Sequence, residues 1–236
     1  AGGLAVMIGA MVICAVLGIV IERFAYRPLR GRSKLSVLIT AIGVSLLLEN
    51  AGQIIFGPNP QPFPTVFPSH TFEFENGRLV LSSKDVVVLI VAIVLMSALQ
   101  FLVLKTKIGT AMRAAAFNPQ AASLMGININ SIISFTFGLG SALAAAGGIL
   151  WAYKFPKIDP LMGVMPGLTA FVAAVLGGIG NIPGAALGGL VIGIIEAFVK
   201  GSRMSTWSEG IAFVLLIIIL LFRPAGLLGT LQPEKV

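Results

Sequence analysis

Long apolar stretches, separated by short polar or basic segments, make up most of this chain. Most of them approach the ~20 residues that an α-helix, rising ~1.5 Å per residue, needs to cross ~30 Å of hydrocarbon. The pattern therefore predicts an all-α fold, a polytopic bundle of transmembrane helices. We expect its spans at residues 2–21, 35–56, 86–104, 132–153, 167–179 together with 185–199, and 211–222.

The apolar region 167–199 is too long for a single span. As one helix, its about 33 residues would extend ~50 Å, well beyond the hydrocarbon even when tilted. The sequence GNIPG at 180–184 offers a break, and non-helical backbone is tolerated in a membrane where protein buries it or where it lines a wet cavity. We therefore expect a re-entrant or broken helix near 180–184, with the C-terminus in the cytoplasm. One long tilted span is the alternative, and it would put the C-terminus outside.

Two segments between the predicted spans suggest structure on the outer surface. Five prolines between residues 58 and 68 prevent a helix and favour an extended strap. Residues 71–82 alternate around Asn76-Gly77, a pair that accepts the positive φ angles of a type I′ turn. We expect a small external β-hairpin near 71–82.

Lysine and arginine residues gather in the segments 22–34 and 105–113, between apolar stretches. Cytoplasmic loops of membrane proteins carry such an excess of cations, so both segments are predicted to face the cytoplasm. This distribution also accounts for the formal net charge of +7. We therefore expect no nucleic-acid partner.

The composition agrees with a membrane protein and excludes several other classes. With 57% hydrophobic residues, 11% charged residues and a mean hydropathy of +1.00, the chain has too little polar surface for a soluble domain, so its surroundings are the lipid bilayer. The single cysteine, Cys14, excludes an internal disulfide and a cysteine-based metal site. No lysine stands in the pattern G-x-x-x-x-G-K-[ST], so there is no P-loop. We expect neither an enzyme nor a metal or cofactor site.

The polar stretch 105–130 is the first candidate for a functional element. Asn118 suits a helix N-cap, Pro119 the first helical position, and Gly126 the left-handed residue that ends a helix. The predicted helix, 119–125, has only about two turns, so it requires packing from outside to remain formed.

Two interpretations of this short helix follow from its faces. Ala121, Leu124 and Met125 share one face by their spacing, and the small Ala122 is expected to let a partner approach closely. One interpretation is an interfacial helix that lies on lipid headgroups. The other is a helix that docks into the groove of a cytoplasmic partner.

Polar side chains within the predicted spans are candidates for a translocation path, because charge is costly in the membrane. Glu49 lies on one helical stripe with Ser45 and Gln53, and this stripe would face a polar cavity or a neighbouring subunit. Alternatively, Glu49 reaches interfacial water or caps a neighbouring helix. Asn181, at the predicted break, either touches the substrate or bonds exposed backbone.

Small residues that recur every four positions indicate close helix contacts in lipid. We expect this helix-packing role for Gly180, Gly184, Gly188, Gly189 and Gly193.

Several motifs, in order along the chain, resemble the permease subunits of branched-chain amino-acid ABC importers. They are ERFAYRPLR at 22–30, LITAIGVSLLLEN at 38–50, AMRA at 111–114, MGIN at 125–128, AFVAAVLGGIG at 170–180, PGAALGG at 183–189 and FRPAGLLG at 222–229. The chain is most similar to the H-type subunit of the leucine, isoleucine and valine systems, and the similarity covers nearly all of it.

The resemblance implies a role for the short helix. In permeases of ABC importers, a cytoplasmic loop with the pattern Glu-Ala-Ala, three residues, Gly docks on the ATPase subunit. Gln120, Ala121, Ala122 and Gly126 take those places, with Gln replacing Glu, and the Ile-x-Leu-Pro that follows in the general pattern is absent. The expected ATPase-coupling loop consists of Arg113, Asn118, Pro119, Gln120, Ala121, Ala122, Leu124, Met125 and Gly126.

The resemblance also implies partners and a location. It implies a second, homologous permease subunit, cytoplasmic ATP-binding subunits and a periplasmic substrate-binding protein, in the bacterial inner membrane. The family's early Asn-Phe-Ala-His-Gly stretch is absent, so we expect residues 1–236 to be a single permease domain shortened at its N-terminus.

Two other functions stay open at the level of the sequence. They are a channel or secondary carrier for a small polar solute, and an assembly subunit that does not transport. The resemblance leaves branched-chain amino acids, other amino acids, amides and urea as substrate classes.

Overall fold

The computed structural model describes residues 2–63, 71–74, 79–202, 205–223 and 225–229. The chain forms two compact units, Ala1–Leu161 and Met162–Val236. Five of the described helices are long and apolar enough to cross a membrane. They are Gly2–Leu29, Leu35–Phe56, Ser83–Lys105, Ile129–Lys154 and Ile182–Lys200. The expected polytopic helical membrane bundle is confirmed.

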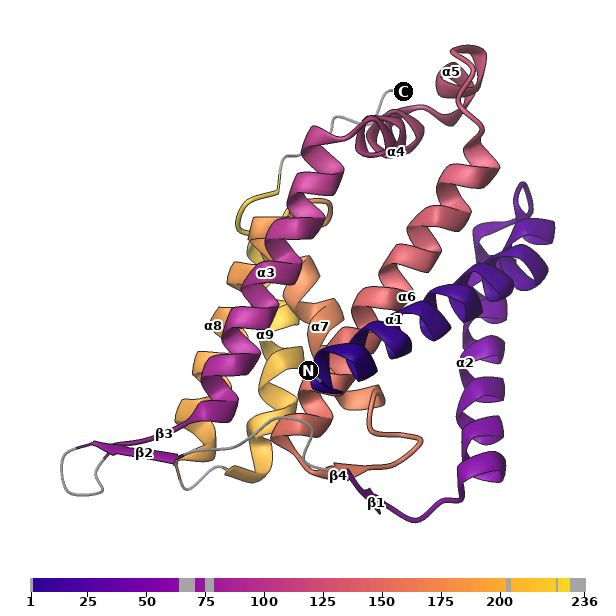
Figure 1. Cartoon of the computed structure of the whole chain (residues 1–236). Coiled ribbons are helices and arrows are strands. Elements are labelled where there is room, and N and C mark those ends of the chain that lie inside the picture. The colour runs from indigo at the N-terminus through magenta and orange to yellow at the C-terminus, as the bar shows by residue number, and fades with distance from the viewer. Residues whose placement is uncertain (1, 64–70, 75–78, 203–204, 224, 230–236) are drawn as a thin grey trace. The chain divides into compact units, whose positions relative to one another are not determined.

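The first unit consists of helices with two small sheets (Figure 1). Its α-helices are α1 (Gly2–Ile21), α2 (Lys34–Phe56), α3 (Ser83–Lys105), α4 (Lys107–Phe117), α5 (Pro119–Leu124) and α6 (Ile129–Lys154). Between α1 and α2, the π-helix η1 (Glu22–Tyr26) and the 3₁₀ helix η2 (Arg27–Leu29) carry the basic segment. The described helices cover the four expected spans of this region, with their ends shifted by a few residues.

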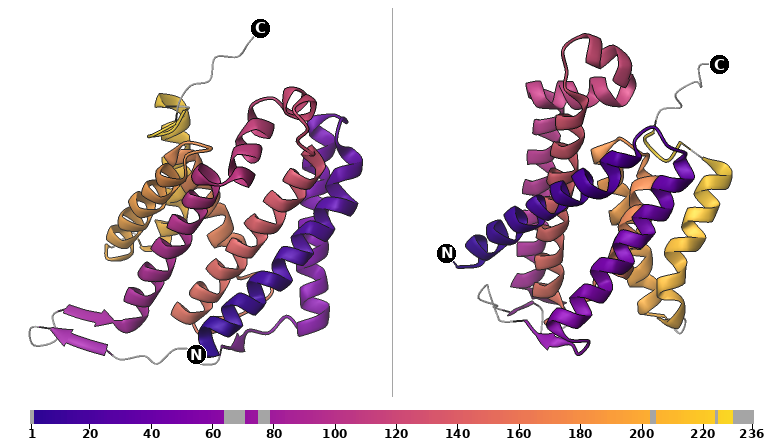
Figure 2. Two further views of the ribbon diagram at one scale, coloured as in Figure 1. Left: turned by 45° about the horizontal axis from the view of Figure 1, so that its top comes forward. Right: turned by 90° about the vertical axis from the view of Figure 1, so that its right-hand side faces the viewer.

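The packing of α1 against α6 organises the first unit (Figure 2). A Cβ on Gly18 would overlap the side chain of Ser141, and a Cβ on Gly138 would press on Ile19 at 3.0 Å. Glycine at both positions therefore lets the two backbones approach closely, as small residues do in membrane helix contacts. The rings of Tyr26 and Phe137 continue the contact, with their centroids 5.1 Å apart.

Two antiparallel sheets lie at the opposite end of this unit from α4 and α5 (Figure 1). Strands β2 (Thr71–Phe74) and β3 (Leu79–Ser82) form the expected hairpin, with Thr71 opposite Ser82. The predicted turn at Asn76-Gly77 lies outside the described residues. Strands β1 (Gln61–Pro62) and β4 (Lys157–Ile158) join the proline-rich strap to the segment that follows α6.

In the second unit, α7 (Val164–Gly177) and α8 (Ile182–Lys200) are the two halves of the expected broken helix. Gly178 and Gly180 between them have φ angles of 104° and 92°, which favour glycine. Gly188 lies against the Ala173 carbonyl and Gly184 against that of Gly177, so α8 runs back along α7. One long tilted span is therefore excluded.

The core of the second unit lies where α9 (Ser208–Phe222) packs on this helical hairpin. Val172, Ala173, Leu176 and Ile192 are buried there, against Leu215, Leu216 and Ile219. The segment after α9 closes the break: the backbone N–H groups of Leu227 and Leu228 donate to the carbonyls of Leu176 and Gly177, at 2.8 and 3.1 Å. These bonds satisfy carbonyls at the end of α7 that the helix itself leaves without partners.

The five glycines expected at helix contacts differ in their surroundings. Gly184 and Gly188 are buried in the α7–α8 contact, and Gly189 is in ordinary contact, 3.9 Å from the Ala173 Cβ. Within the described part of the chain, a Cβ on Gly180 or Gly193 would meet no heavy atom within 4 Å. Gly180 supplies the turn instead, because it precedes α8 and cannot share a face with Gly184. The four-residue spacing therefore predicts more glycines in the helix contact than the structure places there.

Candidate functional site

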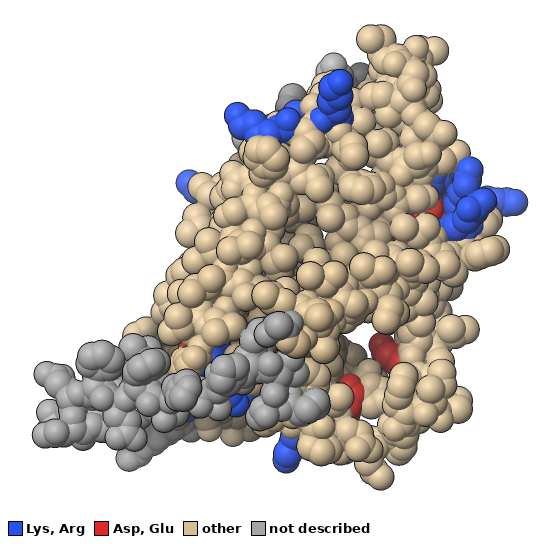
Figure 3. Space-filling model, viewed as in Figure 1, with Lys and Arg blue, Asp and Glu red and all other residues tan. Residues whose placement is uncertain are grey.

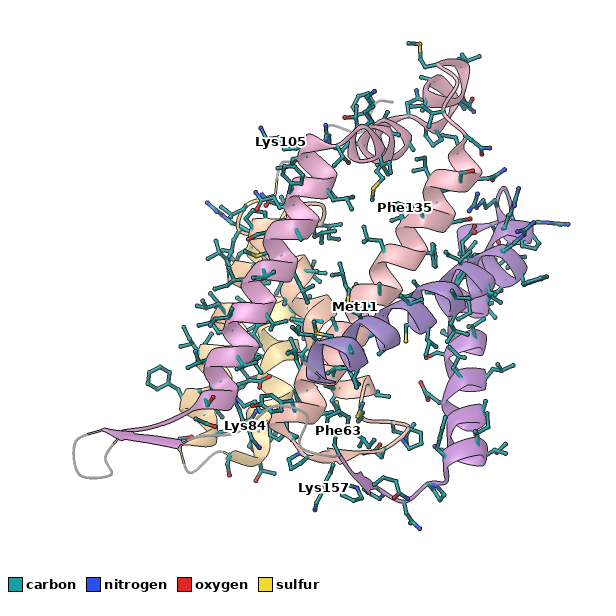
Figure 4. All side chains as sticks on the ribbon, viewed as in Figure 1. Met11, Phe63, Lys84, Lys105, Phe135 and Lys157 are labelled. Atoms are coloured by element: carbon teal, nitrogen blue, oxygen red, sulfur yellow. The ribbon has the colours of Figure 1, made fainter. Side chains whose placement is uncertain are left out.

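The polar stretch 105–130 folds into α4, a short turn and α5, which we call the α4–α5 arm (residues 107–126). Lys105 marks the corner at which α3 ends and the arm begins (Figure 4). A Cβ on the buried Gly109 would overlap the carbonyls of Leu102 and Val103, so glycine permits the sharp corner. The Thr106 hydroxyl accepts from Gly109 N at 3.0 Å and caps α4.

Arg113, expected in the coupling loop, fastens α4 to α3. Its guanidinium donates to the Val103 carbonyl and, at 3.4 Å, to the Thr110 hydroxyl. Val103 belongs to the last turn of α3, where carbonyls lack helical partners and a cation is favoured. Arg113 therefore positions the arm.

Helix α5 is short but capped at both ends. Asn118 Oδ1 accepts from Ala121 N at 3.0 Å, and Pro119 occupies the first turn. At the other end Gly126, with φ of 81°, donates to the Ser123 carbonyl and Ile127 N donates to the Ala122 carbonyl. This is the Schellman arrangement, in which the left-handed residue lets the chain satisfy the last carbonyls. The caps hold a helix that its length alone would not stabilise.

The side chains of α5 divide into an inner and an outer set. Leu124 and Met125 are 88% and 83% exposed, and Gln120 and Ala121 are exposed as well. Ala122 is only 5% exposed. The expectation that Ala122 lets a partner approach is therefore wrong, because its methyl group faces the chain's own interior. The outward surface is formed by Leu124 and Met125 instead.

A cavity of about 980 Å³ lies beneath the arm. Arg30 and Arg113 contribute to its wall, together with Asn118, Pro119 and Gln120. Most of its other lining residues are apolar side chains of α4 and α6, including Ile132, Ile133 and Phe137. The arm is thus anchored at its two ends, on α3 and α6, over a hollow.

The polar stripe expected on α2 does not lead into one cavity. Ser45 lines a space of about 330 Å³ between α1, α2 and α6, and its hydroxyl donates to Glu49 Oε1 at 3.0 Å. Glu49 and Gln53 do not line this space. The hydrogen bond within α2 gives Glu49 a partner one turn away, so its carboxylate is partly satisfied locally.

Asn181 has both ends of its side-chain amide engaged. Its Oδ1 accepts from Gly184 N at 3.0 Å, which caps α8, and its Nδ2 donates to the Leu228 carbonyl at 2.9 Å. We expected Asn181 either to touch the substrate or to bond exposed backbone, and its side chain bonds to backbone.

A buried ion pair near the end of α1 was missed at the level of the sequence. Glu22 is fully buried, bonded to the Arg30 guanidinium through one oxygen and to the Ser134 hydroxyl through the other. Arg30 also donates to Asn130 Oδ1 at 2.5 Å. The available signal was that Glu22 is the only acid in the basic segment 22–34. These bonds join the α1–α2 connection to the start of α6.

In the described part of the chain, no group of three or more His, Cys, Asp or Glu residues could hold a metal ion. The chemistry present is that of helix caps, ion pairs and exposed apolar side chains, which bind and position.

Comparison with known proteins assigns residues 1–220 to the family described as branched-chain amino acid transport system / permease component. The chain is 40% identical, over 99% of its length and 76% of the relative's, to the high-affinity branched-chain amino acid transport system permease protein BraD of Pseudomonas aeruginosa. It is 40% identical to the corresponding permease LivH of Escherichia coli K12, over 97% of this chain and 75% of the relative. A probable LivH from Methanocaldococcus jannaschii is 30% identical over 92% of this chain and 72% of that protein. No solved structure matches the chain.

Proposed function

The chain belongs to the family of branched-chain amino acid transport system permease components, and on that premise we propose how it works within an ATP-driven importer. It forms the membrane-spanning path for branched-chain or closely related amino acids across the bacterial inner membrane. Separate cytoplasmic ATPase subunits drive it, a second permease subunit completes the path, and a periplasmic binding protein delivers the substrate. The α4–α5 arm is the element on which the ATPase acts.

The exposed face of α5 is the observation that carries this proposal. Leu124 and Met125 lie almost fully exposed on a helix that is held rigid by caps at both ends. Burying each side chain is worth roughly 1.5–3 kcal/mol, and little ordering entropy opposes docking because the helix is already formed. Such an exposed apolar helix suits a groove in a partner protein better than it suits water.

The charges at this end of the first unit support a cytoplasmic location. Figure 3 shows Lys and Arg side chains gathered at the α3–α4 corner and again near the end of α1. Lys105 and Lys107 flank the corner, and Arg23, Arg27 and Arg32 belong to the second group. Under the positive-inside rule, these segments face the cytoplasm.

The attachments of the arm suggest how a push on α5 reaches the membrane. At one end, Arg113 and the corner at Gly109 tie α4 to the last turn of α3. At the other end, the side chain of Asn128 caps α6 by accepting from Ser131 N at 3.3 Å. A movement of α5 by the ATPase therefore tilts α3 and α6, and this is how ATP hydrolysis would alternate access to the path.

A secondary carrier or channel is the second candidate, because broken helices often carry binding sites in transporters. The break between α7 and α8 is of that general kind. Its backbone carbonyls, however, accept from Leu227 and Leu228, and the Asn181 amide has two backbone partners. An importer is therefore the better account. ATP-independent uptake by the assembled complex would favour the carrier.

The proposal is tested by replacing Leu124 and Met125 with serine together. We expect the ATPase subunits to be lost during purification of the complex and ATP-driven uptake to fall at least about tenfold, because two buried apolar contacts disappear. The control is Ile54→Ser on α2, which removes a side chain that is similarly exposed, at 84%. Normal copurification and uptake by the double variant would contradict the docking role of α5.

A further inference from the structure

A polar cavity of about 410 Å³ lies between the end of α1, the π-helix η1 and the start of α6. Two arginines of η1 and η2 and four polar residues of α6 and its cap line it. They are Arg23, Arg27, Asn128, Asn130, Ser131 and Ser134. Unlike the larger cavity under the arm, this one is built mainly from polar and charged side chains.

The asparagines of this cavity have already used their acceptor atoms. Asn128 Oδ1 accepts from Ser131 N at 3.3 Å, and Asn130 Oδ1 accepts from the Arg30 guanidinium at 2.5 Å. The Ser131 backbone N–H and the Arg30 guanidinium can only donate, so the amide atom that faces each of them must be the oxygen. The amide nitrogens, which are donors only, are what these two residues can offer to a ligand. With two guanidinium groups beside them, the lining suits a ligand rich in acceptor oxygens.

The charge of the cavity is uncompensated within the described part of the chain. Glu22 is the only acid of the basic segment, and it is consumed by Arg30 and the Ser134 hydroxyl. Arg23 and Arg27 are exposed, and their guanidinium groups form no hydrogen bond or ion pair with the described residues. An anion would therefore meet two free guanidinium groups without a competing carboxylate. Guanidinium groups bind phosphate oxygens through paired hydrogen bonds.

Apolar surface adjoins this anionic-ligand chemistry. Ile19 and Phe135 complete the wall of the cavity, and Phe135 lies on α6 (Figure 4). On α1, Val16 and Val20 are 56% and 43% exposed, two turns and one turn away from Arg23 respectively. A site with cations at its mouth and apolar helix beside it fits an amphiphile better than it fits a free inorganic anion.

We propose that this cavity binds the phosphate headgroup of an anionic phospholipid, with the acyl chains lying along the exposed face of α1. That the lipid comes from the cytoplasmic leaflet rests on the orientation given under the proposed function. Basic pockets between membrane helices on the cytoplasmic side have the composition that recruits such headgroups. The bound lipid links Arg23 and Arg27 to the N-terminal end of α6, and it therefore stabilises the contact between α1 and α6 next to the arm.

Native mass spectrometry of the assembled complex, extracted from membranes that contain phosphatidylglycerol, tests this site. We expect Arg23→Gln with Arg27→Gln to lower retained phosphatidylglycerol about tenfold, since each cation near the surface contributes to binding. The control pair, Arg32→Gln with Lys107→Gln, removes the same charge at the same end of the unit without touching the cavity, and it should retain the lipid.

Four results would overturn the proposal. Unchanged lipid in the first pair would do so, and so would an equal loss in both pairs, which would indicate general surface attraction. Loss of an ATPase subunit with the lipid retained would assign the arginines to a protein contact.

A further experiment adds inorganic phosphate to the complex in phosphatidylcholine nanodiscs. If inorganic phosphate stabilised the complex as much as phosphatidylglycerol does, the cavity would be a site for free anions, and this result would also contradict the proposal. Lipid retention requires no ATP hydrolysis, so a complex that keeps the lipid but fails in ATP-driven uptake contradicts the proposed function and leaves the lipid site standing.

Discussion

Asn118 at the start of α5 and Asn181 at the start of α8 make the same local bond. Each side-chain oxygen accepts from the backbone N–H three residues later at 3.0 Å, and each helix has a proline in its first two positions. Their surroundings differ. Around Asn181, glycines bring backbones into contact and the segment near Leu228 closes the break. After Asn118, the helix carries Leu124 and Met125 outward, and a Cβ on Gly126 would meet no atom of the described residues within 4 Å.

The difference shows that a capping sequence determines where a helix begins and says nothing about what the helix contacts. At 178–184, the break serves internal packing of the second unit. At 118–126, the same capping chemistry leaves an apolar surface exposed, on which we place the contact with the ATPase. Substitutions at the two breaks should therefore change different properties. At 178–184 they should lower stability, and at 118–126 they should weaken coupling to the ATPase.

The largest effect on stability is expected for Gly188→Val. A side chain there collides with the Ala173 carbonyl in the α7–α8 contact, and overpacking of this kind costs about 3 kcal/mol. The melting temperature of the purified complex measures the effect. Gly193→Val on the same helix is the matched control, because a Cβ there would meet no described heavy atom within 4 Å, and it should melt like the unaltered protein. Equal melting temperatures for the two variants would mean that the α7–α8 contact is not as close as described.

Gly126→Val should act on coupling with a smaller cost in stability. The φ angle of 81° is unfavourable for a β-branched residue by roughly 1–3 kcal/mol, and this strain would undo the end of α5 without any clash. We expect normal membrane insertion but reduced copurification of the ATPase and reduced ATP-driven uptake. Gly126→Asn, which tolerates left-handed backbone, should retain most of both. A valine variant with normal uptake would contradict the role of this helix end.

The smallest and most discriminating effects are expected for the two cap residues. Replacing either asparagine by alanine costs about 1 kcal/mol of helix stability. Asn181→Ala also loses the bond to the Leu228 carbonyl, so it should lower the melting temperature more than Asn118→Ala does. Asn118→Ala should instead lower the ATPase activity that substrate stimulates. If both variants changed the same property to the same extent, the distinction between the two breaks would fail.

Much of the fold follows from periodicity and from start and stop signals, and these are local. The helices, the break near 180–184 and the caps of α5 were predicted because Asn, Pro and Gly act within one turn of chain. Ala122 was placed on the wrong side because spacing shows which residues share a face and not which face meets the rest of the protein. The same limit applies to Gly180 and Gly193.

Contacts between distant segments account for what the sequence did not reveal. Glu22 meets Arg30 and Ser134 only because η1 changes the helical register and α6 packs alongside. The pairing of Gln61 with Ile158 joins two connecting segments that follow different predicted spans. For the first contact the sequence offers only a lone acid in a basic segment, which does not identify the partners, and for the second contact it contains no local signal. The single permease domain expected for residues 1–236, and the roles of the candidate coupling and path residues, stay predictions.

The central claim is that α5 meets the ATPase in the cytoplasm, and a cysteine at Leu124 tests it most directly. With Cys14 replaced by alanine, Leu124→Cys is the only thiol in the chain, on a side chain position that is 88% exposed. A membrane-impermeant maleimide should label it in inside-out vesicles and not in intact cells, and assembly with the ATPase subunits should protect it. Labelling from the outside, or equal labelling with and without the ATPase, would contradict the account.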